Sequence, residues 1–410
     1  MGSNGVDGKG GLKPNLALYG SAASTYFSDT LLMNFLFPYA VVLGASFDQM
    51  GVIRSVRNLF QNILQIGWGE ISERFSRRIL IAIGYFSSGC LITAFLFFRN
   101  PLQFLALVIL QSIVWSAATP AWSSLLADYT SLRTRGKILG KIGAVSRLSG
   151  VIATLMVALI TYSQPERMTT SSFILPFILS AAAAIIGATL ILFVNEIKVE
   201  RRVYGKNNIL SPLLDRDFRF FLTVNGLYWF TMAFAWPLFP YVTVNVVHAT
   251  VWQIAVISAT SGLITSIFQP KLGSAIDRFG RKNLLAISRT SLFLFPLLYA
   301  FATSWLHLLA INALLAISIS ASMISISAYI MDSAPPGLRA NYTASANMVM
   351  GTAAFLGSLT GGVFTNQLSA LMDEKQALFI GLIASSFLRL ITSLGFLFIK
   401  ETLPKNESPR

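Results

Sequence analysis

Long apolar stretches alternate with short polar and charged segments along almost the whole chain. Most of these stretches reach about 20 residues, the length that an α-helix needs to cross a bilayer. We therefore predict an all-α membrane protein with twelve transmembrane helices. They are expected over residues 18–44, 50–71, 79–98, 101–127, 138–163, 172–195, 218–245, 251–272, 283–303, 305–331, 342–368 and 376–399.

The two halves of the chain repeat each other at an offset of 204 residues. Gly69-Glu-Ile-Ser-Glu73-Arg74-Phe-Ser76-Arg77-Arg78 in the first half matches Gly273-Ser-Ala-Ile-Asp277-Arg278-Phe-Gly280-Arg281-Lys282 in the second. Asp128 and Asp332 have the same offset, and each precedes an arginine by seven residues. A repeat of this length indicates a duplicated domain. Residues 50–71 are the most polar of the predicted helices. We predict that they cross the membrane because their counterpart, residues 251–272, is apolar.

The composition indicates lipid as the solvent. Hydrophobic residues make up 54% of the chain and charged residues 12%, whereas a soluble domain has about 25% charged residues. The formal net charge of +14 does not indicate a nucleic-acid partner, because the basic residues form short clusters between apolar stretches. Such clusters follow from the preference of lysine and arginine for the cytoplasmic side of a membrane.

The basic residues also predict the topology. Only Arg99, Arg167 and Lys375 fall in the loops on one side, so that side is expected to be external and both termini cytoplasmic. We predict a protein of the plasma membrane. Its parts are a tail (1–17), a six-helix bundle (18–195), a polar linker (196–217), a second six-helix bundle (218–399) and a tail (400–410).

Two six-helix halves, a polar linker and a Gly-x-x-x-Asp-Arg-x-Gly-Arg-Lys loop after the second helix of each half resemble the major facilitator superfamily. The first copy departs from the loop pattern, with Glu73 for Asp and Ser76 for Gly. The resemblance implies a secondary transporter that is a monomer. It also implies a charge network that closes the cytoplasmic side. By motif, that network comprises Glu73, Arg77 and Asp128, and in the second half Asp277, Arg281 and Asp332.

Two signatures of the superfamily's drug:proton antiporters are missing. Val108 and Ser112 flank Gln111 where that branch has arginine and glycine, and the fifth helix has no proline between Gly143 and Gly150. A multidrug or hydrophobic-cation exporter is therefore the alternative interpretation and not the leading one.

Asp29 is the carboxylate that lies deepest in a predicted helix. It is about 16 Å along the helix from its start. Its counterpart in the second half is Thr231, at the local offset of 202 that Leu36-Phe-Pro-Tyr39 and Leu238-Phe-Pro-Tyr241 give for the first helix of each half. A carboxylate at that depth is costly unless it is paired, hydrated or protonated. Since the fold does not require it in both halves, we predict that Asp29 couples transport to proton movement.

Further polar side chains inside the predicted helices are candidates for substrate binding. Gln61 lies on a polar face of the second helix, and Arg57 borders that face. Arg147 and Arg389 are too deep to reach the surface easily. Arg289 is expected to extend to the membrane surface instead. The predicted substrate-binding residues are Tyr26, Asn34, Arg57, Gln61, Arg147, Asn225, Trp229 and Arg389.

The excess of arginine over carboxylate inside the membrane favours an anionic or zwitterionic solute, moved by alternating access with protons as the coupling ion. The sequence offers no nucleophile–base pair, metal-ligand cluster or nucleotide-binding loop. We therefore predict no catalytic residue, no metal and no cofactor. The expected partners are a small-molecule substrate, H⁺ and the lipid bilayer.

Overall fold

The computed structural model describes residues 14–129, 135–163, 168–196, 211–335 and 338–402, which form helices and connecting loops without a strand. The α-helices are α1 (Leu16–Val42), α2 (Phe47–Arg74), α3 (Arg77–Ala94), α4 (Pro101–Asp128), α5 (Arg135–Thr161), α6 (Ile174–Leu192), α7 (Arg216–Phe234), α8 (Leu238–Tyr241), α9 (Val251–Phe279), α10 (Arg281–Ser291), α11 (Leu294–Ala300), α12 (Trp305–Ser333), α13 (Arg339–Ser369) and α14 (Glu374–Leu394). Short 3₁₀ or π turns cover Thr170–Phe173, Ser211–Leu214, Val242–Val246 and Gly395–Leu397.

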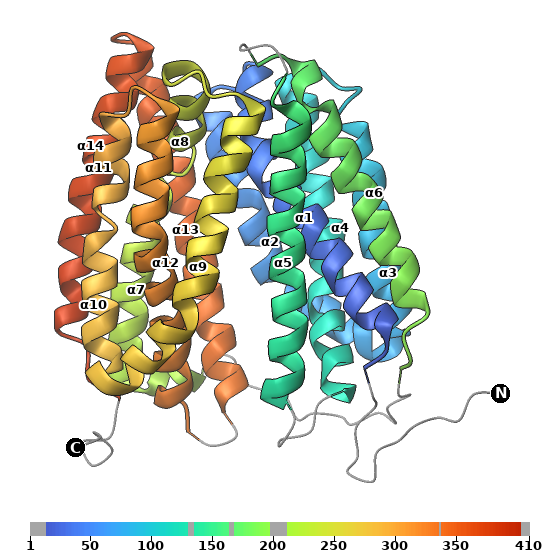
Figure 1. Ribbon diagram of the computed structural model, residues 1–410. Helices are drawn as coiled ribbons and strands as arrows, with labels where there is room; N and C mark the ends of the chain where they lie inside the picture. Colours follow the sequence, from blue (N-terminus) through green and yellow to red (C-terminus); the bar gives the residue numbers. More distant parts are fainter. Residues whose placement is uncertain (1–13, 130–134, 164–167, 197–210, 336–337, 403–410) are drawn as a thin grey trace. The chain divides into compact units, whose positions relative to one another are not determined.

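The chain divides into two compact units. Unit 1 comprises Met1–Leu43 and Phe60–Val203, and unit 2 comprises Gly44–Leu59 and Tyr204–Arg410. Figure 1 shows unit 1 in blue to green, and unit 2 from yellow-green to red except for Gly44–Leu59, which is blue. Each unit is a bundle of long helices.

The same helix pairs pack together in both units. In unit 1, α1 packs on α5 and α6, and α3 packs on α4 and α6. In unit 2, α7 packs on α13 and α14, α10 packs on α12, and both α10 and α11 pack on α14. The offset of 204 residues in the sequence therefore corresponds to a duplicated arrangement of helices.

The start of α2 belongs to unit 2 because its main chain is held there. The Tyr241 hydroxyl donates to the Ala45 carbonyl, and the Phe47 and Tyr241 rings lie 4.1 Å apart. The Ser358 hydroxyl donates to the Gly51 carbonyl over 3.0 Å. Helix α2 thus begins in unit 2 and continues into unit 1.

Two of the predicted helices are broken in the structure, which corrects the expectation of unbroken helices over 218–245 and 283–303. The first becomes α7, α8 and a π turn, and the second becomes α10 and α11. Proline explains both breaks, because it lacks an N–H donor and its ring clashes with the carbonyl four residues earlier. Pro237 and Pro240 follow α7, and Pro296 lies in α11. Main-chain carbonyl groups at these breaks accept hydrogen bonds from Arg389 in the interior of unit 2.

Helix α13 approaches α7 closely through two glycines one turn apart. A Cβ at Gly357 would collide with the Phe230 carbonyl, and one at Gly361 with the Phe234 carbonyl. Small residues four apart let helix backbones approach in a membrane, where dispersion contacts and not hydrophobicity drive packing.

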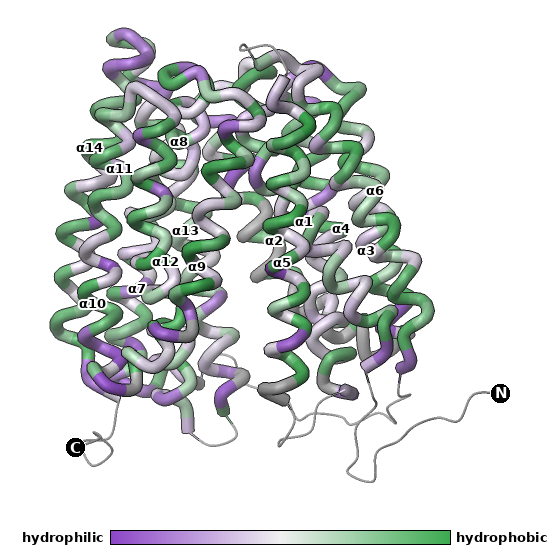
Figure 2. Tube along the Cα trace, viewed as in Figure 1, coloured by the Kyte–Doolittle hydropathy of each residue, from purple (hydrophilic) through white to green (hydrophobic). Residues whose placement is uncertain are grey.

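The surface has the apolar character that a bilayer requires. Among the described residues, eight stretches are long and apolar enough to cross a membrane: 101–126, 138–161, 170–192, 251–269, 281–300, 305–333, 341–369 and 374–397. Large apolar side chains are exposed along the helices, including Ile83, Leu159, Leu227 and Phe387. Figure 2 shows hydrophobic positions along the helices and most hydrophilic positions near their ends.

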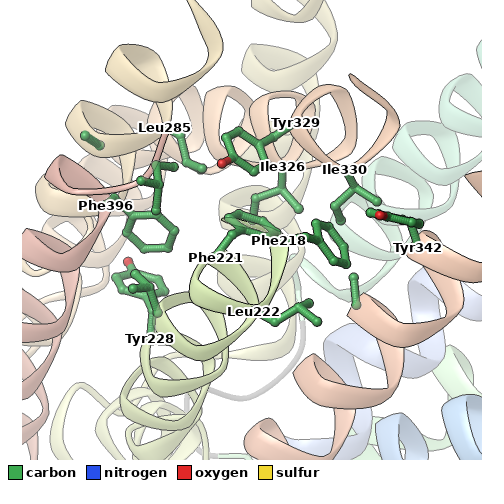
Figure 3. Close-up of a cluster of buried hydrophobic side chains, with 14 of the residues drawn as sticks. Phe218, Phe221, Leu222, Tyr228, Leu285, Ile326, Tyr329, Ile330, Tyr342 and Phe396 are labelled. Carbon is green, nitrogen blue, oxygen red and sulfur yellow. The ribbon is translucent and has the colours of Figure 1, made fainter. Parts of the chain in front are cut away.

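Each unit also has its own buried core. In unit 1, Tyr85, Trp115 and Tyr129 belong to a buried cluster with side chains of α1, α3, α4 and α6. In unit 2, aromatic residues of α7 pack against α10, α12, α13 and the turn after α14 (Figure 3). This second cluster includes Tyr228 and Phe396, whose rings form an edge-to-face pair.

Candidate functional site

A charge cluster connects α3, α4 and the segment after α6 in unit 1. The Arg77 guanidinium lies 3.2 Å from Asp128 at the end of α4 and 3.2 Å from Glu196. It also donates to the Ser124 carbonyl over 3.0 Å. The side chains of Arg77, Asp128 and Glu196 are only 8%, 10% and 13% exposed. We call these three residues the unit-1 charge cluster.

The equivalent cluster in unit 2 connects α10, α12 and the segment after α14. The Arg281 guanidinium donates to Asp332 over 2.8 Å, and the Arg281 and Lys282 main-chain N–H groups donate to Glu401 over 3.0 and 3.1 Å. The Asp332 side chain is 34% exposed, more than Asp128 in unit 1. We call Arg281, Asp332 and Glu401 the unit-2 charge cluster.

Glu196 and Glu401 are members of these clusters that the sequence interpretation missed. Each carboxylate accepts hydrogen bonds from the first N–H groups of a helix, which have no partner within the helix. Glu196 does so at Arg77, and Glu401 does so at Arg281 and Lys282. The available signal was the match of Phe193-Val-Asn-Glu196 with Phe398-Ile-Lys-Glu401 at an offset of 205.

The surroundings of Glu196 favour its charged form. Burial acts to raise the pKa of this carboxyl, but hydrogen bonds from the Ser76 hydroxyl and the Arg77 N–H, together with the Arg77 charge, outweigh burial and lower the pKa below its ordinary value. The position lies outside the membrane-spanning segments, just after α6.

Four of the predicted site residues have side chains that lie outside what the structure describes. These are Arg57, Gln61, Glu73 and Asp277. Their predicted roles in substrate binding and gating therefore stay predictions.

Asp29, Tyr26 and Arg147 come together in unit 1, where α5 packs on α1. Both charged groups act electrostatically on the Tyr26 hydroxyl, and Asp29 acts on Tyr85 as well. Asp29 is half-buried, while Tyr26 and Arg147 are exposed. We call Tyr26, Asp29 and Arg147 the unit-1 polar cluster.

Helix α5 is held in register beside α1 by hydroxyl groups on either side of Arg147. The Ser146 hydroxyl donates to the Ala22 carbonyl over 3.4 Å, and the Ser149 hydroxyl donates to the Ala23 carbonyl over 2.8 Å. Because these bonds set the position of α5 along α1, they set the position of Arg147 relative to Tyr26.

The predicted residues of unit 2 lie mostly in its interior. Asn225 is fully buried, Arg389 is 3% exposed and Trp229 is half-buried. Arg289 is 2% exposed, so the expectation that it extends to the membrane surface is wrong. Its guanidinium instead lies over the Tyr228 ring, 4.4 Å from the ring centroid, which partly offsets the loss of hydration.

Asn34, the remaining predicted residue, lies on α1 with its side-chain nitrogen buried and without a hydrogen-bond acceptor. A buried donor of this kind is costly and marks a place where a ligand or water is expected to bind.

The sequence profile of the Major Facilitator Superfamily matches residues 18–234 and again residues 221–410. An uncharacterised MFS-type transporter of Methanocaldococcus jannaschii is 22% identical over 393 residues, which are 89% of this chain and 96% of that protein. A lactose permease sequence of Klebsiella pneumoniae is 32% identical over 96 residues, which are 23% of this chain and 73% of that sequence.

Solved transporter structures have the same fold. The nucleoside transporter NupG superposes with a TM-score of 0.74 at 14% identity, over 94% of this chain and 98% of its own. A bacterial homologue of the human lysosomal transporter Spinster, inward-facing and occupied, gives 0.70 at 14% identity, over 94% and 95%. At such low identities the likeness concerns the fold and not the substrate.

Proposed function

This chain belongs to the major facilitator superfamily, and on that premise we propose that it is a secondary active transporter of a small anionic or zwitterionic organic solute. In this proposal the two halves expose a central site alternately to each side of the membrane. The protein works as a monomer in the plasma membrane, with both termini in the cytoplasm.

The observation that carries the proposal is the unit-1 polar cluster. Arg147 and Asp29 lie within electrostatic range of one tyrosine hydroxyl. A solute anion that binds the Arg147 guanidinium would change the charge beside Asp29. In this proposal that change couples substrate binding at Arg147 to proton binding at Asp29.

The substrate-binding side chains in this proposal come from both units. Tyr26, Asn34 and Arg147 contribute from α1 and α5, and Asn225, Trp229 and Arg389 from α7 and α14. Arg57 and Gln61 of α2 complete the set. Arginine suits the role because its planar guanidinium binds a carboxylate through two parallel hydrogen bonds.

We propose that the two charge clusters act as gates. Each joins the start of one helix to the end of another through ionic contacts, which would have to separate or move together when the cytoplasmic side opens. Glu73 and Asp277 are included by their place in the repeated loop.

A hydrophobic-cation exporter is the second candidate. The observation that favours it is an exposed aromatic ring, Tyr26, beside the half-buried carboxylate of Asp29. Aromatic faces and carboxylates together attract organic cations.

Counterflow in proteoliposomes tests these alternatives directly. The panel contains organic anions, amino acids, nucleosides, lactose and lipophilic cations; nucleosides and lactose are included because of the similar proteins. We expect exchange of an anionic or zwitterionic solute, with apparent affinity at least about tenfold weaker in Arg147→Gln. Arg216→Gln, at an exposed position, is the matched control. Exchange of lipophilic cations alone would contradict the anion proposal and favour the exporter.

A further inference from the structure

Arg389 is held by two main-chain carbonyl groups at the helix breaks. Its guanidinium donates to Met232 O over 2.7 Å and to Leu292 O over 3.3 Å. Leu292 O receives no bond from residue 296, because Pro296 has no N–H, and it accepts from the Phe295 N–H over 3.2 Å as well as from Arg389. Met232 O is free because the Trp236 N–H bonds to Ala233 O instead. The terminal nitrogens of Arg389 thus have partners, whereas its buried Nε has none.

Arg289 lies in an aromatic cage in the same interior. Its guanidinium carbon is 4.4 Å from the centroid of Tyr228, 5.5 Å from Trp229 and 6.0 Å from Phe396. One terminal nitrogen lies 3.6 Å from the Met232 sulfur, a weak acceptor. The Nε of Arg289 is buried and also lacks an acceptor.

The two guanidinium groups are neighbours. Both contact Met232, one at its sulfur and the other at its carbonyl, and the charge of Arg289 acts on Arg389. Within the part of the chain that the structure describes, neither forms an ion pair with an aspartate or glutamate. Two buried like charges without a counter-charge are unfavourable.

The unpaired groups around the two arginines are chiefly donors. Besides the two Nε atoms, the indole N–H of Trp229 is buried without an acceptor. Asn225, one helical turn earlier on the same face of α7, has a buried side-chain amide with both atoms unpaired. These donors need a hydrogen-bond acceptor, and the two positive charges need a negative one. A single anion would supply both.

We propose that Arg289 and Arg389 hold one small anion in the interior of unit 2, against the Nε atoms of both guanidinium groups and beside the Trp229 indole. Exposures of 2% and 3% show that both side chains are buried, which excludes a large ligand. The ligand is therefore a halide or the carboxylate group of a solute. The site belongs to unit 2 and stands whether or not Asp29 couples protons.

Anion titration of the full-length protein in detergent tests the proposal. Gluconate, which is too large for the site, is replaced by chloride, bromide, formate or acetate at constant ionic strength, and the melting temperature is followed. A ligand that binds only the folded state raises it and the rise saturates, here by about 3 °C. Halides effective at lower concentration than carboxylates indicate an inorganic ion, and the reverse order indicates the carboxylate of a solute.

Substitutions and tryptophan fluorescence show where the anion binds. We expect Arg289→Gln to weaken the apparent affinity at least about tenfold and Arg216→Gln to leave it unchanged. Arg389→Lys keeps the charge but loses the planar fork, and it is used with Arg389→Gln in case the latter does not fold. Bromide should quench tryptophan fluorescence saturably, and this component should disappear in Trp229→Phe. A melting temperature independent of the anion, or a non-saturating rise equal in wild type and Arg289→Gln, would overturn the proposal.

Discussion

The two charge clusters share one geometry although their sequences differ at a key position. In unit 1, Ser76 precedes the helix and its hydroxyl donates to Glu196 over 2.6 Å. In unit 2, Gly280 occupies that position with φ +89°, and a Cβ there would collide with the Glu401 carboxylate. Glycine leaves space for the carboxylate where serine binds it. Ser76, where the first copy departs from the family pattern, therefore keeps a contact with the carboxylate.

The clusters differ more in burial than in contacts. Arg77 and its two acidic partners are at most 13% exposed, whereas Asp332 in unit 2 is 34% exposed. Breaking a buried ion pair leaves an uncompensated charge, while an exposed pair is replaced by water at little cost. We infer that unit 1 depends more strongly on its cluster for stability.

The largest expected difference between the units is the effect of removing each arginine. Arg77→Gln should destabilise the protein by about 3 kcal/mol, because it removes the guanidinium charge that lies between two nearly buried carboxylates. Arg281→Gln should cost about 1 kcal/mol, because water replaces the contact with Asp332. Thermal or denaturant unfolding in detergent measures both, with Arg216→Gln as the control. Equal losses would contradict the inferred difference between the units.

A smaller difference in stability, which depends on pH, should result from replacing Glu196. Its pKa is lowered in the folded protein, so the stability it contributes is complete above the ordinary glutamate pKa of about 4.3. That stability is lost as the pH falls through the lowered value, because the carboxyl is then protonated in both states.

We therefore expect the melting temperatures of wild type and Glu196→Gln to differ by a constant amount from pH 7 to about pH 5 and to converge below about pH 4. Glu374→Gln, at an exposed position, should show no such convergence. A difference that grows as the pH falls would show that the Glu196 carboxylate does not stabilise the folded state.

The interiors of the two units differ as well. Arg289 has Tyr85 as its counterpart at the offset of 204, and Tyr85 packs against Trp115 in an ordinary buried core. Unit 2 thus keeps two arginines where the same fold needs none. The fold does not explain their presence, which is why they suggest a ligand.

The apolar stretches of the sequence predicted the helical class. The network that joins Arg77 to Asp128 and Arg281 to Asp332 was implied by the resemblance of the repeated loop to the superfamily motif, and the structure has both ion pairs. The sequence did not predict the burial of Arg289, because helix periodicity does not say which face meets a neighbouring helix and which meets lipid. Glu196 and Glu401 were missed because they follow the last helix of each half, where a change of offset to 205 breaks the register. The sequence also did not predict that two helices are broken near prolines. Main-chain carbonyl groups at these breaks bind Arg389, which is distant in the sequence.

The most direct test of the proposed mechanism is solute accumulation driven by a pH gradient in proteoliposomes, compared with counterflow in the same vesicles. Asp29→Asn should keep counterflow and lose accumulation, because it still binds and moves the solute but carries no proton. Asp373→Asn, at an exposed position just before α14, should keep both. Gradient-driven accumulation that persists in Asp29→Asn would contradict proton coupling through this residue.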